Sequence, residues 1–498
     1  MYRPPKSHAQ TSLFCSLEEQ LNHKHSLYVL ANKIDWNKFE TEFSKRFDDK
    51  MGAPNKPIRL MTGLIILKHI RNVSDESVVE QFQENAYYQY FCGERFFSTE
   101  QPCDPSELVH FRHMIGEAGM DMILKESILV NDDHDKQGPT GCGTVFLDTT
   151  VQEKNITFPT DAKLANKIIE QVQRIVEEHD LPQRQSYKRT LKKVHRDQRF
   201  RNHPKNGKKA HKADRRLKTI AGRLVRELER NLASKNLLNT YKEKIELFKK
   251  VLAQKKCDKD KVYSLHEPEV KCIGKGKEHK KYEFGNKVSI ARSYSGIIVG
   301  AVSFRDEYDG HTIDDTLDHV EQMLGFRPSR AACDRGYRGQ KESGTTKIVI
   351  PDVPKKNATY YQKEKAHKLF CKRAGIEPIN GHLKSDHRMG RNFYKGIFGD
   401  MLNAKLAAAA FNFKRAMRRF FVLLEWLYCC FLCREGVNKN GNLLILRSRS
   451  DFLRVNYIVV VCLPIFEKIV VYHIVKKIGL FVNEIFFKRH TINFLYLF

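Results

Sequence analysis

Residues 144–151 read TVFLDTTV, an apolar and β-branched run that carries one carboxylate, Asp148. Such a run predicts a buried strand, and a carboxylate within it is costly unless it is paired or bound to a cation. Two more carboxylates stand in similar places: Asp334 follows the short apolar run 330–333, and Glu377 lies in a helical stretch. If they converge, their oxygens suit Mg²⁺ or Mn²⁺.

The neighbours of Glu377 follow helical spacing. On one unbroken helix, four side chains would lie along the same side: Phe370, Arg373, Glu377 and Lys384. Pro378 does not fit deep inside a regular helix, so two alternatives stay open. Either the helix kinks there, or a new helix begins near Glu377 after Gly375 has ended the previous one. Both alternatives project Glu377 and Lys384 together.

The amino-terminal region predicts an all-helical module. Apolar residues recur at helical spacing from about residue 57 to 120, and helix starts are expected at Ser74 and Asp104. Aromatic residues gather at 87–91, where a packed core is favoured over stacking on unpaired bases. Such a module could hold a helix that enters the major groove of DNA.

Further strand patterns occur at 283–292, 296–304, 330–333 and 347–351, and helical patterns follow from about 358 to 420. Alternation of strands and helices predicts an α/β domain with its core in a sheet. The residues after about 434 show no clear periodicity, and we expect weak order there. No role follows from their sequence.

A strongly basic segment separates the first strand from the rest. Two amphipathic stripes flank it, and residues 184–218 hold fifteen Lys or Arg against two Asp. This density favours an insertion that contacts DNA phosphates over a merely solvated surface. The candidate DNA-binding residues there are Lys192, Lys193, Arg196, Lys208 and Lys209.

Composition narrows the class of protein. The chain has 498 residues, 41% of them hydrophobic and 29% charged, which excludes collagen, coiled coil and wholesale disorder. Its 87 Lys and Arg against 59 Asp and Glu indicate an acidic partner, either nucleic acid or an anionic membrane. The longest apolar run, 420–433, is shorter than the about twenty residues of a membrane span. Scattered cysteines and a start without an apolar stretch indicate the cytoplasm.

The motifs together resemble the DDE transposases of bacterial insertion sequences, in the branch with DxGY and YxxRxxxExxxxxxK signatures. Asp334-Arg335-Gly336-Tyr337 matches the first signature, and the residues around Glu377 match the second, except that Phe370 replaces its Tyr. The stretches LVHFRHMIGEAGM (108–120) and HEPEVKCIGKGKEHKKYEFGNKVSIA (266–291) are also similar. The resemblance covers roughly residues 15–420.

The resemblance implies an α/β fold with a ribonuclease-H-like mixed sheet and flanking helices. Asp148 would lie on the first strand, Asp334 at the end of the fourth, and Glu377 on a following helix. These catalytic residues would hold two Mg²⁺ ions, or Mn²⁺ in their place, for phosphodiester cleavage and strand joining. Arg373 and Lys384 would contact DNA phosphate.

The predicted plan has an N-terminal helical DNA-binding domain (1–140), a catalytic domain (141–160 and 261–420), a basic helical insertion (161–260) and a hydrophobic C-terminal tail (421–498). Expected partners are double-stranded DNA, as transposon ends and target, and a second copy in a synaptic homodimer, with no membrane. The expected location is the bacterial cytoplasm, at the nucleoid. Two alternatives stay open: a DDE-type nuclease without strand transfer, and an inactive transposase-derived DNA-binding protein.

Overall fold

The structure is a computed structural model that describes residues 16–47, 55–132, 143–199, 201–255, 257–274, 278, 280–305, 307–351, 358–435, 447–449 and 456–458. It divides into two compact units at residues 417 and 418. The second unit contains the end of helix α15 (Gly396–Glu435) and an antiparallel strand pair, β8 (Arg447–Arg449) with β9 (Asn456–Ile458). Most of the tail for which weak order was predicted lies outside the described residues.

The amino-terminal part is helical, as predicted. Its helices are α1 (Leu17–Gln20), α2 (Ser26–Lys33), α3 (Trp36–Ser44), α4 (Ile58–Arg71), α5 (Asp75–Glu84), α6 (Ala86–Phe91) and α7 (Pro105–Asp132). The two expected helix starts are confirmed, because Ser74 accepts from the backbone N–H of Ser77, and Asp104 from that of Ser106. Phe91 is fully buried, which agrees with a packed aromatic core.

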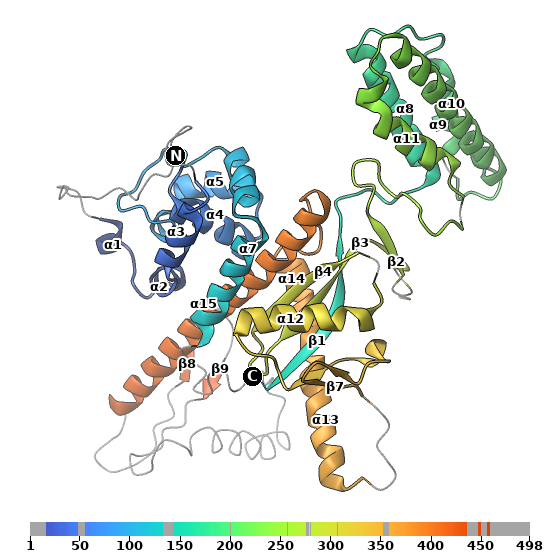
Figure 1. Cartoon of the computed structure of the whole chain (residues 1–498). Coiled ribbons are helices and arrows are strands. Elements are labelled where there is room, and N and C mark those ends of the chain that lie inside the picture. The colour runs from blue at the N-terminus through green and yellow to red at the C-terminus, as the bar shows by residue number, and fades with distance from the viewer. Residues whose placement is uncertain are drawn as a thin grey trace. The chain divides into compact units, whose positions relative to one another are not determined.

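A mixed sheet follows (Figure 1). Its strands are β1 (Thr144–Glu153), β2 (Lys271–Gly274), β3 (Tyr282–Arg292), β4 (Ile298–Phe304), β5 (Arg330–Ala332), β6 (Glu342–Ser343) and β7 (Thr346–Val349). The order is β2-β3-β1-β5-β7-β6, with β4 also paired to β3. β1 runs antiparallel to β3 and parallel to β5, so the mixed α/β prediction is confirmed.

Helices accompany this sheet. They are α12 (Ile313–Leu324), which contacts β4 and β3, then α13 (Tyr360–Ala374), α14 (Ile376–Asp386) and α15. Asp334 comes after the fifth strand in the chain, not the fourth as expected. The difference arises because the short strand β2 precedes β3 and pairs with it from Lys271 opposite Gly285. Among the described residues, no helix is long and apolar enough to cross a membrane.

Four helices lie between β1 and β2 in the chain: α8 (Asp161–Glu178), α9 (Lys188–Gln198), α10 (Gly207–Ser234) and α11 (Leu238–Ala253). Both predicted stripes are buried, for example at Leu164 and Ile168 on α8 and at Leu217 and Leu228 on α10. These side chains belong to one hydrophobic cluster contributed by all four helices. The insertion therefore has its own core, which leaves its basic side chains for the surface.

The chain leaves and re-enters the sheet around one glycine. Gly285 on β3 is opposite Glu153 of β1 on one side and opposite Lys271 of β2 on the other. A Cβ at this position would lie 2.0 Å from the carbonyl oxygen of Gln152. Only glycine lets the backbones of β1 and β3 approach this closely.

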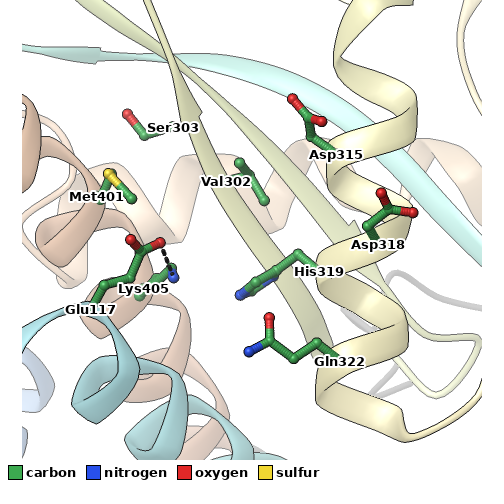
Figure 2. Close-up of a pocket in the computed structure, with 9 residues that line it drawn as sticks. All are labelled: Glu117, Val302, Ser303, Asp315, Asp318, His319, Gln322, Met401 and Lys405. Carbon is green, nitrogen blue, oxygen red and sulfur yellow. Dashed lines mark hydrogen bonds and ion pairs between the residues drawn. The ribbon is translucent and has the colours of Figure 1, made fainter.

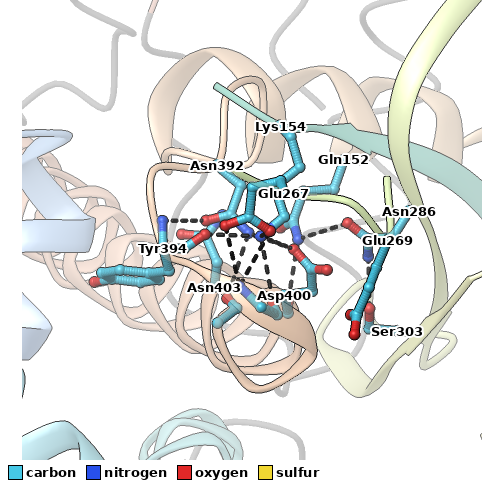
Figure 3. Close-up of polar contacts among 12 residues, drawn as sticks. Gln152, Lys154, Glu267, Glu269, Asn286, Ser303, Asn392, Tyr394, Asp400 and Asn403 are labelled. Atoms are coloured by element: carbon cyan, nitrogen blue, oxygen red, sulfur yellow. Dashed lines mark hydrogen bonds and ion pairs between the residues drawn. The ribbon is translucent and has the colours of Figure 1, made fainter. Parts of the chain in front are cut away.

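A buried polar network joins the end of β1 to the start of α15 (Figure 3). The ammonium group of Lys154 lies 2.7 Å from Asp400 and 3.5 Å from Glu267, and Arg305 is 3.1 Å from Asp400. Burial raises the pKa of Asp400, although the charges of Lys154 and Arg305 oppose this shift. Asn392 adds a hydrogen bond to Asp400 at 2.8 Å. Because a buried charge is stable only when paired, these contacts fix α15 against the sheet.

Candidate active site

Asp148 lies on β1, and Asp334 begins the turn after β5, the parallel neighbour of β1. The β1–β5 register ends where Phe146 lies opposite Ala332, which is two residues before Asp148 on β1 and two residues before Asp334 in the turn after β5. Both carboxylates lie close to the buried thiol of Cys333. Burial raises the pKa of this thiol, and the negative charges of Asp334 and Asp148 raise it further. The two carboxylates therefore act on the same buried thiol, Asp334 from just beyond the carboxyl end of β5 and Asp148 from the middle of β1.

The motif around Asp334 shapes a short turn. Asp334 Oδ1 accepts a hydrogen bond of 2.8 Å from the backbone N–H of Gly336. Tyr337, at the end of the turn, is almost fully buried, and burial together with the charges of Cys333 and Asp148 raises its pKa well above the usual value. The Tyr337 ring anchors the turn, so the Asp334 carboxylate keeps its position.

Glu377 comes from a helix that begins just before it. α13 ends at Ala374 and α14 starts at Ile376, so the second alternative is correct and the single unbroken helix is wrong. The reason is local, because Gly375 separates the helices and Pro378 fits the first turn of the new one. Arg373, from the preceding helix, donates a 3.3 Å hydrogen bond to Glu377, whose side chain is 66% exposed.

Asn380 links this helix to the sheet. α14 packs against β1, and Asn380 Nδ2 donates a 2.8 Å hydrogen bond to Asp148 Oδ2. Asn380 is buried and lies three residues after Glu377, which places both on one side of the helix. Sequence reasoning missed this residue, although its spacing from Glu377 was an available signal.

The carboxylates offer the oxygen donors that Mg²⁺ and Mn²⁺ prefer. Within the described ranges, however, no three His, Cys, Asp or Glu side chains are close enough to hold one ion. Glu377 faces Arg373, while Asp148 is held by Asn380. A three-carboxylate site would therefore require the exposed Glu377 side chain to turn away from Arg373 and toward Asp148 and Asp334.

The predicted DNA-binding residues divide between two regions. Arg373 and Lys384 lie on α13 and α14, on either side of Glu377 in the chain. The five others are exposed on α9 and α10 of the insertion: Lys192, Lys193, Arg196, Lys208 and Lys209. Lys209 also pairs with Asp197 at 3.0 Å. Their exposure leaves most of this positive charge available to an acidic partner.

A separate hollow of about 290 Å³ lies among α7, β4, α12 and α15 (Figure 2). Lys405 at its wall pairs with Glu117 and Asp121, both at 2.7 Å. His319 lies 2.9 Å from the same Asp121. These four side chains are paired with one another, and the hollow lies between the helical part and the sheet.

Comparison with known proteins gives a family match for the amino-terminal part of the chain. Residues 15–114 match the family model described as "Transposase domain (DUF772)". The chain thus contains a transposase-family domain, which implies an enzyme that interacts with DNA.

A protein of Rhizobium meliloti described as "Uncharacterized protein ORF8 in nfe locus" is 38% identical over 178 residues, which are 36% of this chain and 86% of that protein. The chain belongs to the family of this relative. No solved structure matches it.

Proposed function

We propose that the chain is a DDE transposase with a ribonuclease-H-like catalytic domain. It would bind insertion-sequence ends and catalyse metal-dependent strand cleavage and strand transfer through Asp148, Asp334 and Glu377. The observation that carries this proposal is that Asp148 on β1 and Asp334 just after the parallel strand β5 both act on the buried thiol of Cys333, with α14 bonded to Asp148 through Asn380. The transposase domain at residues 15–114 supports the same class.

In this proposal the three carboxylates would hold two Mg²⁺ ions, or Mn²⁺ in their place. The ions would lower the pKa of the attacking water or DNA 3′-hydroxyl and stabilise the leaving oxygen. Asn380 orients the Asp148 carboxylate by its hydrogen bond. Arg373 and Lys384 would bind phosphate oxygens. Once Arg373 binds phosphate, its contact with Glu377 would be lost, and Glu377 would be free to turn toward Asp148 and Asp334.

The DNA partners follow from the same proposal. The helical amino-terminal part would recognise the ends, and the basic insertion would bind phosphates without reading sequence. Joining two ends to one target requires both ends to be held at once. We therefore include a homodimer in the proposal, with one chain at each end.

A strand-transfer assay tests the proposal. The full chain is incubated with labelled DNA ends from the element that encodes it, a supercoiled target and Mg²⁺, and we expect nicked ends and joined products. Asp148→Asn, Asp334→Asn and Glu377→Gln should each lower the rate on the order of a hundredfold or more, because each removes a charge that stabilises the transition state. Glu321→Gln on α12 is the control, since Glu321 pairs with Arg327 at 3.0 Å and belongs to neither the candidate site nor the basic insertion.

The products separate the alternatives. Cleavage without joining would identify a nuclease, and end binding without either reaction would identify an inactive DNA-binding protein. Full activity of Glu377→Gln would remove Glu377 from the catalytic set. Equal decreases in Glu321→Gln and Glu377→Gln would show a general effect of removing a helix carboxylate.

A further inference from the structure

Helix α13 has an unusual surface for its length. None of the fifteen residues from Tyr360 to Ala374 is buried, and Tyr360 and Tyr361 are 82% and 71% exposed. A capping box at Thr359 stabilises its start, and Arg292 donates hydrogen bonds to the carbonyl oxygens of Lys372 and Gly375 at its end. Arg292 thus ties the end of the helix to β3, while most of the surface of the helix faces solvent.

A groove of about 830 Å³ lies along this helix, with walls from α13, the start of β5 and the turn after β3. Four cations and one carboxylate line it, and the carboxylate of Glu364 pairs with Lys368 at 2.7 Å. The other three cations are Arg330, Lys365 and Lys372. The net positive charge selects an anionic occupant.

Two tyrosines add exposed aromatic rings to the groove. Tyr361 lines it with a largely exposed ring, and Tyr294, 51% exposed, lies under the ammonium group of Lys372 at 4.3 Å from the ring centroid. Exposed aromatic rings among cations form the surfaces on which unpaired bases stack. In a duplex the bases are already stacked on one another. Duplex DNA would therefore contact only the cations of the groove and not its aromatic rings.

We propose that this groove binds a single strand of DNA, with bases stacked on Tyr361 and phosphates on Lys365, Lys372 and Arg330. This inference rests on the proposed function, because α13 leads to Glu377 through the contact with Arg373. A strand lying along α13 would pass toward the carboxylates. The groove would hold the DNA that becomes unpaired beside the cleavage position.

Binding in EDTA tests the proposal independently of any metal-dependent reaction. Fluorescence anisotropy of the full chain is measured with a labelled mixed-sequence oligonucleotide, as a single strand and as a duplex. Tyr361→Ala should weaken single-strand binding roughly tenfold, because one base no longer stacks, and Tyr361→Phe should restore it. Tyr360→Ala is the matched control: it removes the neighbouring exposed ring, which does not line the groove.

The lysines are tested by salt dependence. Lys365→Gln with Lys372→Gln should lower the slope of log affinity against log salt by about 0.7 for each phosphate that the groove no longer neutralises. Lys363→Gln, on α13 but outside the groove lining, should leave the slope unchanged. Equal effects of Tyr360→Ala and Tyr361→Ala, or a weakening confined to duplex binding, would overturn the proposal. Single-strand binding that weakens as expected in these variants would support it even if strand transfer failed.

Discussion

At the scale of single residues, Gly285 shows how one position limits the fold. Its missing Cβ allows the carbonyl of Gln152 and the backbone of Glu153 to pack directly against β3. Those neighbours are backbone atoms of the strand that carries Asp148, so they cannot move aside as a flexible side chain can. The approach of β1 to β3 thus depends on this glycine.

We predict that Gly285→Ala destabilises the protein by about 3 kcal/mol, the upper range for overpacking, because the added methyl would force β1 from β3. The shift of the urea unfolding midpoint measures this. Gly274→Ala on β2 is the control, since its Cβ would meet no atom within 4 Å. Equal midpoints for the two variants would contradict the prediction.

The sequence supplied Asp148 and Asp334 as candidates because a carboxylate is unexpected in or after an apolar strand. It supplied Glu377 because Arg373 precedes it and Lys384 follows it at helical spacing in a family signature. It could not supply the hydrogen bond from Asn380 to Asp148, since that contact depends on how α14 packs against β1. The spacing of four residues did place Arg373 beside Glu377, and the structure has a 3.3 Å hydrogen bond between them. Pairing between elements is decided by packing, which local periodicity does not encode.

At the scale of elements, helix starts were predictable because caps such as Ser74 act through their own neighbours. The break between α13 and α14 was only one of two alternatives, since Gly375 and Pro378 are compatible with a kink or a new start. Strand β2 was missed because its four residues owe their structure to pairing with β3 rather than to propensity.

Two hydrogen bonds and two buried histidines join the end of α14 to α4. His387, at the end of α14, donates a 3.0 Å hydrogen bond to the carbonyl oxygen of His69. The side chain of Asn72, just after α4, donates a hydrogen bond to the carbonyl oxygen of Ser385. Burial lowers the pKa of His387 to about 4, with the charge of Lys414 acting in the same direction and the hydrogen bond to His69 opposing it. Burial also lowers the pKa of His69 well below its usual value.

Both histidines are therefore neutral in the folded protein, and the unfolded chain takes up their protons first as the pH falls. We predict that stability is full above pH 6.5 and falls between about pH 6.5 and 4, by about 3 kcal/mol from His387. His387→Asn should flatten this fall by removing one titrating group. Urea unfolding at pH 7, 5.5 and 4 measures it, with the exposed His110→Asn as control. An unchanged pH profile in His387→Asn would contradict the assignment.

At the scale of the whole molecule, the insertion carries much of the positive charge on helices with their own core. We predict that replacing Lys192, Lys193 and Arg196 on α9 by Gln weakens duplex binding. The slope of log affinity against log salt should fall by about 0.9 for each phosphate that the variant no longer neutralises. The matched control replaces Lys242, Lys244 and Lys250, which lie on α11, by Gln. Equal slopes for both triple variants would show that α9 has no special role.

The position of Gly285 also shows how the four-helix insertion is attached to the sheet. Because Glu153 and Lys271 flank the same residue, the exit and return of the four-helix insertion are only two strand spacings apart, about 10 Å. A linker of a few residues spans that gap. The four-helix insertion is thus attached to the sheet at two neighbouring points. Its length can therefore change without altering the pairing of β1, β3 and β2.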